Sequence, residues 1–360
     1  MSIDSPYTLL TAVTLAVIAP GVLAFAWDRG RIAGRIALVT LVVLTASGAA
    51  ALQVNHLTAT YPSWSALFGG PADDDPAGDA PAGGSILDAG AGKGRLATYQ
   101  VPGPVSGMNM PLKVYLPAAY FTPEGQRLRF PVIQALHGYP GTPDYWMRRL
   151  DAVRHLDREI TAGRMAPTVV LFPYQTPDGL VDTECTDLAG GPRAETYLTT
   201  DVRRWASENL RVRTDRTGWG LIGYSAGGFC ATNLAVRHPD LYTAAASLSG
   251  GAEPGIKIGD GSEKTTNNIG WQLAHRPPPP VSLYLAWAAD DGWARKAGQR
   301  VRRLAKSPTV VDTATVPRGG HTSSVWKQME APAFDWLSAH LAGPAPAGPP
   351  ASTGPPAWPT

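Results

Sequence analysis

The chain is poor in the residues that build metal centres and disulfide frameworks. It holds two cysteines in 360 residues, Cys185 and Cys230, and neither a C-x-x-C nor an H-E-x-x-H spacing occurs. Those spacings are typical of zinc sites, so we expect no metal. The two cysteines predict a disulfide if the chain is exported, and two buried free thiols otherwise.

An excess of charge of one sign is also missing. The chain has 31 Lys and Arg against 29 Asp and Glu, a formal net charge of +2. Nucleic-acid-binding domains carry a marked basic surplus, so we expect no nucleic-acid partner. One local basic cluster is most simply the solvated face of a helix, and its members are Arg300, Arg302, Arg303 and Lys306.

Two long uncharged runs lie near the N-terminus, at residues 9–27 and 36–54. Each is about long enough to cross a bilayer, and together with their flanks they predict a transmembrane hairpin over residues 1–56. The link between them holds Arg29, Arg31 and Arg35, whereas no Lys or Arg precedes the first run or follows the second before Lys93. By the positive-inside rule the link is cytoplasmic and both ends of the hairpin are extracytoplasmic.

Two alternatives to a permanent anchor stay open. The second run is preceded by arginines and followed by small residues at 46–50, a pattern that also fits a cleaved signal segment. The two helices could instead pack inside a soluble fold. Both a permanent anchor and a cleaved signal segment imply that the remainder of the chain is exported.

The rest of the chain divides by composition. Residues 57–94 are rich in Gly, Ala, Pro and Asp and predict a flexible tether, and the Pro-rich residues 343–360 predict a disordered tail. Residues 95–342 alternate strand and helix patterns and are numerous enough for one α/β catalytic domain. Within them, residues 252–280 interrupt the alternation, which indicates either a lid or acyl-binding wall or a loop without function.

The most informative motif is G-Y-S-A-G at residues 223–227. A short apolar run precedes it and a helical pattern follows it up to His238-Pro239, so the motif lies at a strand-to-helix turn. This context is typical of a nucleophile elbow, with Ser225 as nucleophile of ester chemistry. The glycines permit the strained backbone of such a turn. The alternative is a serine in an ordinary glycine-rich turn.

The partners of the serine follow in the order acid, then histidine. Residues 281–288 read as a strand, and Asp290 and Asp291 occupy the turn after it. Residues 308–316 read as the last strand, and His321 follows in a Gly-Gly-His loop. His321 is therefore the predicted general base, since it alone lies after the acid and directly after a strand, while His340 falls near the end of an amphipathic helix.

An oxyanion hole is predicted at the end of another strand, residues 130–136, which leads into H-G-Y-P-G. A loop of this kind donates one backbone N–H to the oxyanion, and the residue after the nucleophile donates the other. The predicted donors are Tyr139 and Ala226, because Pro140 has no N–H. We interpret His137 as a residue that braces this loop rather than as a second base.

These motifs resemble the "Putative esterase" family of the α/β hydrolases, which includes esterase D-like enzymes and the mycobacterial trehalose mycolyltransferases. The resemblance extends over about residues 95 to 341, and it implies a mostly parallel central sheet flanked by helices. In such proteins the acid commonly closes a G-x-x-D or S-x-x-D turn, a spacing that selects Asp291 over Asp290, although Ala288 replaces the usual first residue. Further motifs shared with the family are D-T-E-C at 182–185, E-T-Y-L at 195–198, R-H-P-D at 237–240 and the helix containing Trp326 and Trp336.

The sequence thus predicts a membrane-anchored, extracytoplasmic serine esterase. Ser225 attacks the ester, His321 transfers the proton, Asp291 orients the imidazole, and no cofactor is required. The anchor favours an acyl ester of lipid or cell-envelope material as substrate. Acyl transfer to an envelope sugar or lipid uses the same residues and is the alternative; a non-catalytic envelope-binding module is a third interpretation.

Overall fold

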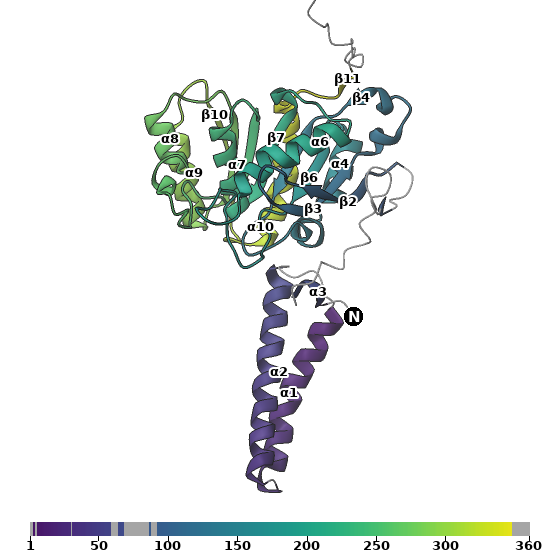
Figure 1. Ribbon diagram of the computed structural model, residues 1–360, viewed down its shortest axis with the longest axis vertical. Helices are drawn as coiled ribbons and strands as arrows, with labels where there is room; N and C mark the ends of the chain where they lie inside the picture. The colour runs from purple at the N-terminus through teal and green to yellow at the C-terminus, as the bar shows by residue number, and fades with distance from the viewer. Residues whose placement is uncertain are drawn as a thin grey trace, which may run out of the picture. The chain divides into compact units, whose positions relative to one another are not determined.

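The computed structural model describes residues 3, 6–29, 31–58, 64–67, 86–87 and 92–347 (Figure 1). The chain forms two units, a helical unit that includes the N-terminal hairpin and an α/β unit that holds most of residues 92–347. Each unit is described by itself.

The helical unit is built on two long helices that lie side by side, α1 (Pro6–Ala26) and α2 (Ile32–Thr58) (Figure 1). A short turn at Trp27–Arg29 joins them. Arg35 fixes this turn, because its Nε donates a 2.9 Å hydrogen bond to the Trp27 carbonyl and its guanidinium lies 5.1 Å from the Trp27 ring. Both helices begin before the uncharged runs in the sequence, and α2 also continues past the end of its run.

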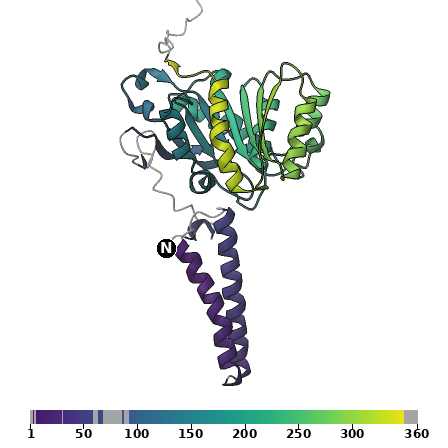
Figure 2. The same ribbon diagram turned by 180° about the vertical axis from the view of Figure 1, so that it is seen from behind.

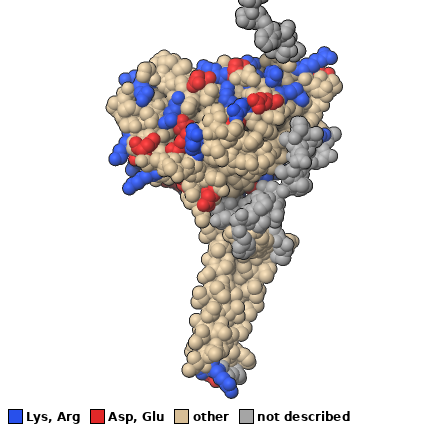
Figure 3. Space-filling view, viewed as in Figure 1, with Lys and Arg blue, Asp and Glu red and all other residues tan. Residues whose placement is uncertain are grey.

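The surface of the hairpin is apolar along its length. The candidate spans are Tyr7–Ala26 and Ile32–His56, with mean hydropathies of 2.3 and 2.0, and few of their residues are buried. Phe25 and Ile32, for example, are 74% and 76% exposed. Figure 3 shows no charged side chain along the shaft of the hairpin and basic side chains at the link. By length and composition, each helix is able to cross a membrane.

The α/β unit is organised around a nine-stranded sheet in the order β1-β2-β3-β6-β5-β7-β8-β9-β10. The first three strands run antiparallel to their neighbours, and the strands from β6 to β10 are mutually parallel. The strands are β1 (Ile86–Leu87), β2 (Arg95–Pro102), β3 (Asn109–Leu116), β5 (Val132–Leu136), β6 (Val169–Pro173), β7 (Trp219–Tyr224), β8 (Ala244–Leu248), β9 (Ser282–Ala288) and β10 (Val310–Val316).

Burial explains why the central strands are mostly apolar; Gln134 of β5 and Ser247 of β8 are buried polar exceptions. Every residue of β5, β6, β7 and β8 is buried, whereas the edge strand β10 has exposed and half-buried residues throughout. A parallel strand covered by helices on both faces has no solvent side, so it does not alternate apolar and polar residues.

Helices cover both faces of the sheet. α10 (Ser323–His340) lies in front of the sheet in Figure 2 and contacts α4 (Ala152–Thr161), while α6 (Val202–Asn209) and α7 (Ala226–Arg237) lie in front in Figure 1. The remaining longer helices, α8 (Ile269–His275) and α9 (Gly292–Leu304), contact each other. A mostly parallel sheet flanked by helices confirms the predicted α/β-hydrolase fold.

The strand register brings the functional loops to one edge. Leu136 of β5 pairs with Gly223 of β7, and Tyr224 pairs with Leu248 of β8. Ala288 of β9 pairs with Val316 of β10. Because these strands are parallel, the loops after them leave the same edge of the sheet, which is where α/β folds place their ligands.

Parts of the predicted tether and tail are ordered. In the tether, α3 (Trp64–Leu67) and β1 are formed, and β1 pairs with β2. In the tail, β11 (Ala345–Pro346) pairs with β4 (Leu128–Arg129), and the Ala347 N–H donates to the Arg127 carbonyl at 2.8 Å. These backbone hydrogen bonds hold the beginning of the tail on the domain. Residues 59–63, 68–85 and 88–91 of the predicted tether and residues 348–360 of the predicted tail lie outside the described residues.

Candidate active site

Ser225 lies on a strained turn between β7 and α7. Its backbone angles are φ 55° and ψ −123°, a conformation that a non-glycine residue rarely adopts. Its N–H donates to the Leu248 carbonyl at 2.9 Å, which ties the turn to β8. A Cβ at Gly223 would lie 1.9 Å from the Gly227 carbonyl oxygen, and one at Gly227 would lie 2.3 Å from that of Leu136. Only glycine fits at these two positions.

A chain of hydrogen bonds joins Ser225, His321 and Asp291. His321 Nε2 lies 2.8 Å from Ser225 Oγ, and His321 Nδ1 lies 2.7 Å from Asp291 Oδ2. A carboxylate only accepts, so Nδ1 donates to it and Nε2 remains to accept the serine hydroxyl proton. The Asp291 side chain is 4% exposed and the His321 side chain 36%, so the imidazole faces the open side.

The two neighbouring aspartates have separate partners. Asp291 ends the turn after β9 and caps α9, since its Oδ1 accepts the Ala294 N–H at 3.1 Å. Asp290 instead accepts the N–H groups of Gly319 and Gly320, at 3.1 and 2.9 Å. The hydrogen bonds from Gly320 and Gly319 lower the pKa of Asp290 below its usual value. Asp291 contacts the imidazole, and Asp290 holds the loop that carries it.

Positive backbone angles shape the histidine loop. Gly319 has φ +130° and Gly320 has φ +61°, values that favour glycine. The loop turns sharply between β10 and α10 and delivers His321 to the serine. The sequence indicated these glycines only as a Gly-rich context, and the bracing role of Asp290 was missed.

Two tryptophans flank the imidazole. The Trp326 and Trp293 rings lie edge-on to His321, with centroids 5.1 and 5.7 Å away. Tyr224, next to Ser225, stacks on Trp326 at 4.8 Å. These rings restrict the imidazole from the side. Trp326 was noted only as part of an aromatic helix, and no motif pointed to Trp293, which comes to the site because α9 starts at Asp291.

The loop after β5 passes directly beside Ser225. A Cβ at Gly138 would lie 3.2 Å from Ser225 Cβ and 2.8 Å from the Tyr224 ring. Tyr139, the next residue, is 38% exposed. Ala226 is the first residue of α7, where backbone N–H groups have no intrahelical partner. The two predicted oxyanion donors therefore come from segments on either side of the serine.

The other described histidines with hydrogen bonds have partners other than Ser225 and Asp291. His137 is buried in the β5 loop, with Nδ1 2.8 Å from the Gly138 oxygen, and Gln175 Nε2 donates to its carbonyl at 3.0 Å. The remaining contacts are His155 with Glu330, His238 with Glu195, His275 with the Trp271 carbonyl and His340 with the Trp336 carbonyl.

Cys185 and Cys230 are joined as a disulfide with Sγ–Sγ 2.09 Å and Cα–Cα 5.5 Å. Cys230 lies on α7, about one helical turn beyond Ser225, and Cys185 lies in the loop after β6. Glu184 and Cys185 both have positive φ, 41° and 57°. The bond links this strained loop to the helix that starts at Ser225.

Glu184 connects the same loop to residues 252–280. Its Oε2 accepts the Gly255 N–H at 2.7 Å. Burial raises the pKa of Glu184 to about 7, and the nearby Asp182 carboxylate adds to the shift, although backbone N–H groups of Gly255 and Ile256 oppose it. A carboxyl group that titrates near neutrality thus holds the start of the interrupted segment.

Glu195, in the E-T-Y-L motif, contacts two residues of the R-H-P-D motif, Arg237 and His238. Its Oε1 accepts a hydrogen bond from Arg237 Nη2 at 2.7 Å and lies 2.7 Å from His238 Nε2. Burial alone would raise the pKa of Glu195, but the hydrogen bond from His238 and the charge of Arg237 lower it. The cluster fixes the C-terminal end of α7.

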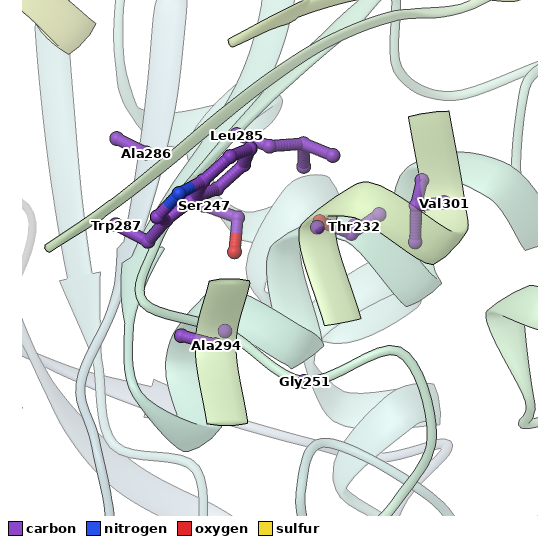
Figure 4. Close-up of a pocket in the computed structure, with 10 residues that line it drawn as sticks. Thr232, Ser247, Gly251, Leu285, Ala286, Trp287, Ala294 and Val301 are labelled. Carbon is purple, nitrogen blue, oxygen red and sulfur yellow. The ribbon is translucent and has the colours of Figure 1, made fainter. Parts of the chain in front are cut away.

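A small cavity of about 10 Å³ lies behind the elbow, large enough for about one water molecule. Figure 4 shows Ser247 and Trp287 from the sheet and Ala294 and Val301 from α9 around it. This cavity is too small for an acyl chain.

Comparison with known proteins places this site in a family. Residues 104–339 match the family described as "Putative esterase", and the chain belongs to this family. It is 28% identical over 167 residues to an esterase of Mycobacterium tuberculosis, covering 46% of this chain and 35% of the relative. It is 34% identical over 106 residues to the diacylglycerol acyltransferase/mycolyltransferase Ag85B of Mycobacterium leprae, covering 27% and 29%.

The fold is shared with solved esterases. A ferulic acid esterase superposes with a TM-score of 0.60 at 20% identity, covering 69% of this chain and 99% of that one. At this identity the likeness concerns the fold. The chain spans about half the length, or less, of the curated relatives that it matches.

Proposed function

We propose that the chain is a membrane-anchored serine esterase that hydrolyses carboxylic esters through an acyl-enzyme. The observation that carries this proposal is the unbroken chain of hydrogen bonds from Ser225 through His321 to Asp291, with the serine on a strained elbow. Membership of the esterase family supports the same reaction class.

In this mechanism Ser225 Oγ attacks the ester carbonyl carbon while His321 Nε2 takes the hydroxyl proton. The imidazolium is stabilised by the buried Asp291 carboxylate. The tetrahedral oxyanion accepts hydrogen bonds from the backbone N–H groups of Tyr139 and Ala226. The C–O bond to the alcohol then breaks, and His321 donates its proton to the departing oxygen. Water, activated by the same imidazole, releases the acid and restores Ser225.

The proposed location is the outer side of a membrane. The apolar surface and length of α1 and α2 support two membrane spans, and the basic side chains at the link support a cytoplasmic position for that link. The catalytic unit then lies outside the cytoplasm, where the Cys185–Cys230 disulfide is stable. Lipid or envelope esters are the corresponding substrates.

Acyl transfer is the second candidate function. The local identity to a diacylglycerol acyltransferase/mycolyltransferase supports it, because an acceptor hydroxyl replaces water in the last step and the triad is otherwise used alike. To separate the two, the full-length protein in neutral detergent is incubated with an acyl ester, with and without a sugar acceptor, and products are identified by mass spectrometry. Free acid in both samples supports hydrolysis, an acyl sugar supports transfer, and no product from any ester contradicts both.

A further inference from the structure

The basic cluster on α9 is more than a solvated helix face. A surface pocket of about 540 Å³ is lined by Trp293, Lys296 and Arg300 of α9 together with Glu253. A second pocket, of about 400 Å³, is lined by Arg300 and Arg303 and by Lys264 across from them. Arg300 borders both pockets, which together we call the α9 groove, and Figure 3 shows basic side chains over α8 and α9 with acidic ones beside them.

Positive charge prevails in this groove. Four basic side chains line the two pockets, and Glu253 is the one acidic side chain among the lining residues that the structure describes. Glu253 is already engaged, since its Oε2 lies 3.3 Å from Arg300 Nη1 and accepts from Asn268 Nδ2 at 3.1 Å. Within the described residues Lys296 has no ion pair. The groove thus has cationic groups in excess of its own anion.

Trp293 places the groove next to the reacting atoms. One edge of its ring faces His321, at a centroid distance of 5.7 Å, and the residue also lines the first pocket. A Cβ at Gly251 would lie 3.0 Å from the Trp293 ring, so the ring packs against the loop after β8. Along α9, Lys296 is about 4.5 Å and Arg300 about 10 Å from Trp293.

The proton transfers of the proposed mechanism determine which part of an ester lies beside His321 and Trp293. The imidazole donates its proton to the departing alcohol oxygen and later takes a proton from water or an acceptor hydroxyl. Both groups therefore approach His321 Nε2, whereas the acyl carbon is held at Ser225. The groove behind Trp293 is on the histidine flank and is placed for the alcohol part of the ester or for the acceptor.

We propose that the α9 groove binds an anionic group, a phosphate or carboxylate, carried by the alcohol part of the substrate or by the acceptor alcohol. This inference rests on the proposed esterase function and specifies its substrate class. Lys296 and Arg300 form charge-assisted hydrogen bonds with the anion, and Trp293 covers the connecting carbon atoms. The covalent step is unchanged: the Ser225 Oγ–C bond forms, the C–O bond to the alcohol breaks, and the proton passes through His321.

The test compares two soluble substrates with one acyl chain, 1-butyrylglycerol and 1-butyrylglycerol 3-phosphate, on the full-length protein in neutral detergent. The quantity compared is the ratio of kcat/KM for the phosphate ester to that for the neutral ester. We expect a ratio of about ten or more for the native chain, because two charge-assisted hydrogen bonds are involved. K296A and R300A bring the ratio close to one, and E253Q raises it.

R302A is the matched control, since Arg302 lies on the same helix, is exposed and lines neither pocket. It retains the native ratio; an equal loss in R302A overturns the site, because general surface charge then explains the preference. Lys296 is exposed, so K296A is expected to fold. This variant therefore keeps the test valid if R300A fails to fold. A native ratio near one with good turnover of the neutral ester overturns the groove and leaves the esterase proposal standing. No turnover of either ester contradicts the esterase proposal itself.

A third substrate distinguishes the sources of the anion. 1-Palmitoylglycerol 3-phosphate is presented in phosphatidylcholine vesicles that contain the full-length protein. Faster turnover of this lipid than of the butyryl phosphate ester identifies a lipid headgroup as the anion, and the reverse identifies a soluble phosphate ester. Either result supports the anion site only if K296A reduces the turnover and R302A does not.

Discussion

Asp291 holds His321 and starts α9 with the same carboxylate. Its Oδ2 lies 2.7 Å from His321 Nδ1, and its Oδ1 accepts the Ala294 N–H at 3.1 Å. The cap fixes the carboxylate by a backbone contact, so the imidazole is oriented by a group that cannot easily rotate. The same cap fixes the direction of α9, and thus the position of Trp293 beside the imidazole.

The first prediction concerns the two aspartates. D291N is expected to lower kcat for a short p-nitrophenyl ester by about 10⁴-fold, because an amide no longer stabilises the imidazolium or its tautomer. D290N is expected to lower it by about tenfold or less, since it weakens only two backbone hydrogen bonds to a solvent-exposed loop. Steady-state kinetics on both variants checks this. The reverse order would assign the acid to Asp290.

The second prediction concerns Glu184 and pH. Its folded-state pKa of about 7 is higher than its ordinary value of 4.5, so the folded chain binds the proton more tightly than the unfolded chain. The free energy of unfolding therefore falls as pH rises from about 4.5 to about 7, by at most about 3 kcal/mol from this group.

E184Q removes this titration while it keeps the shape of the side chain. The Tm of the variant minus the Tm of the native chain is expected to rise between pH 4.5 and 7 and to be constant above about pH 8. Thermal unfolding of both proteins across this range measures the difference. A difference that does not vary with pH shows that Glu184 titrates at an ordinary value in the folded chain.

The third prediction concerns membrane topology. A cysteine at the exposed Lys93, before β2, is expected to react with a membrane-impermeant maleimide in intact cells. A cysteine at the exposed Asp28, in the turn between the two helices, is expected to react only after the cells are opened. The native cysteines do not interfere, because both are in the disulfide. Labelling of Asp28→Cys but not of Lys93→Cys in intact cells inverts the topology.

The sequence predicted the sheet and the strand-to-helix turn at Ser225 because both depend on local rules. Buried parallel strands are apolar runs, and the strained turn at Ser225 requires glycine at 223 and 227. The α/β-hydrolase fold was predicted correctly for this reason. The boundaries of the long helices and the pairing of β11 with β4 were missed, because helix ends and edge pairing depend on tertiary contacts.

The site was less predictable where it depends on packing between distant segments. Asp290 and Asp291 are adjacent in the sequence, and their different partners are set by the direction in which α9 leaves β9. No sequence motif marks Trp293 or the α9 groove. The sequence pattern of an exposed basic helix face is the same whether or not another segment of the chain lies opposite that face. Only the fold brings Glu253 and Arg300 together.

The fourth prediction concerns the nucleophile. S225A is expected to lower kcat/KM for a short p-nitrophenyl ester by at least about a thousandfold, because the members of a triad act as one unit. The fold is expected to persist, so the Tm should stay close to that of the native chain. Activity within about tenfold of the native chain contradicts the assignment of Ser225.

Direct detection of the acyl-enzyme tests the central claim most directly. The full-length protein is mixed with excess p-nitrophenyl butyrate, quenched in acid within the first turnovers, and analysed by intact and peptide mass spectrometry. We expect the added mass of one butyryl group on the peptide that contains Ser225, and none on the same peptide of S225A. An active protein that carries the acyl group on another residue, or an S225A variant that hydrolyses the ester as fast as the native chain, rules out Ser225 as the nucleophile.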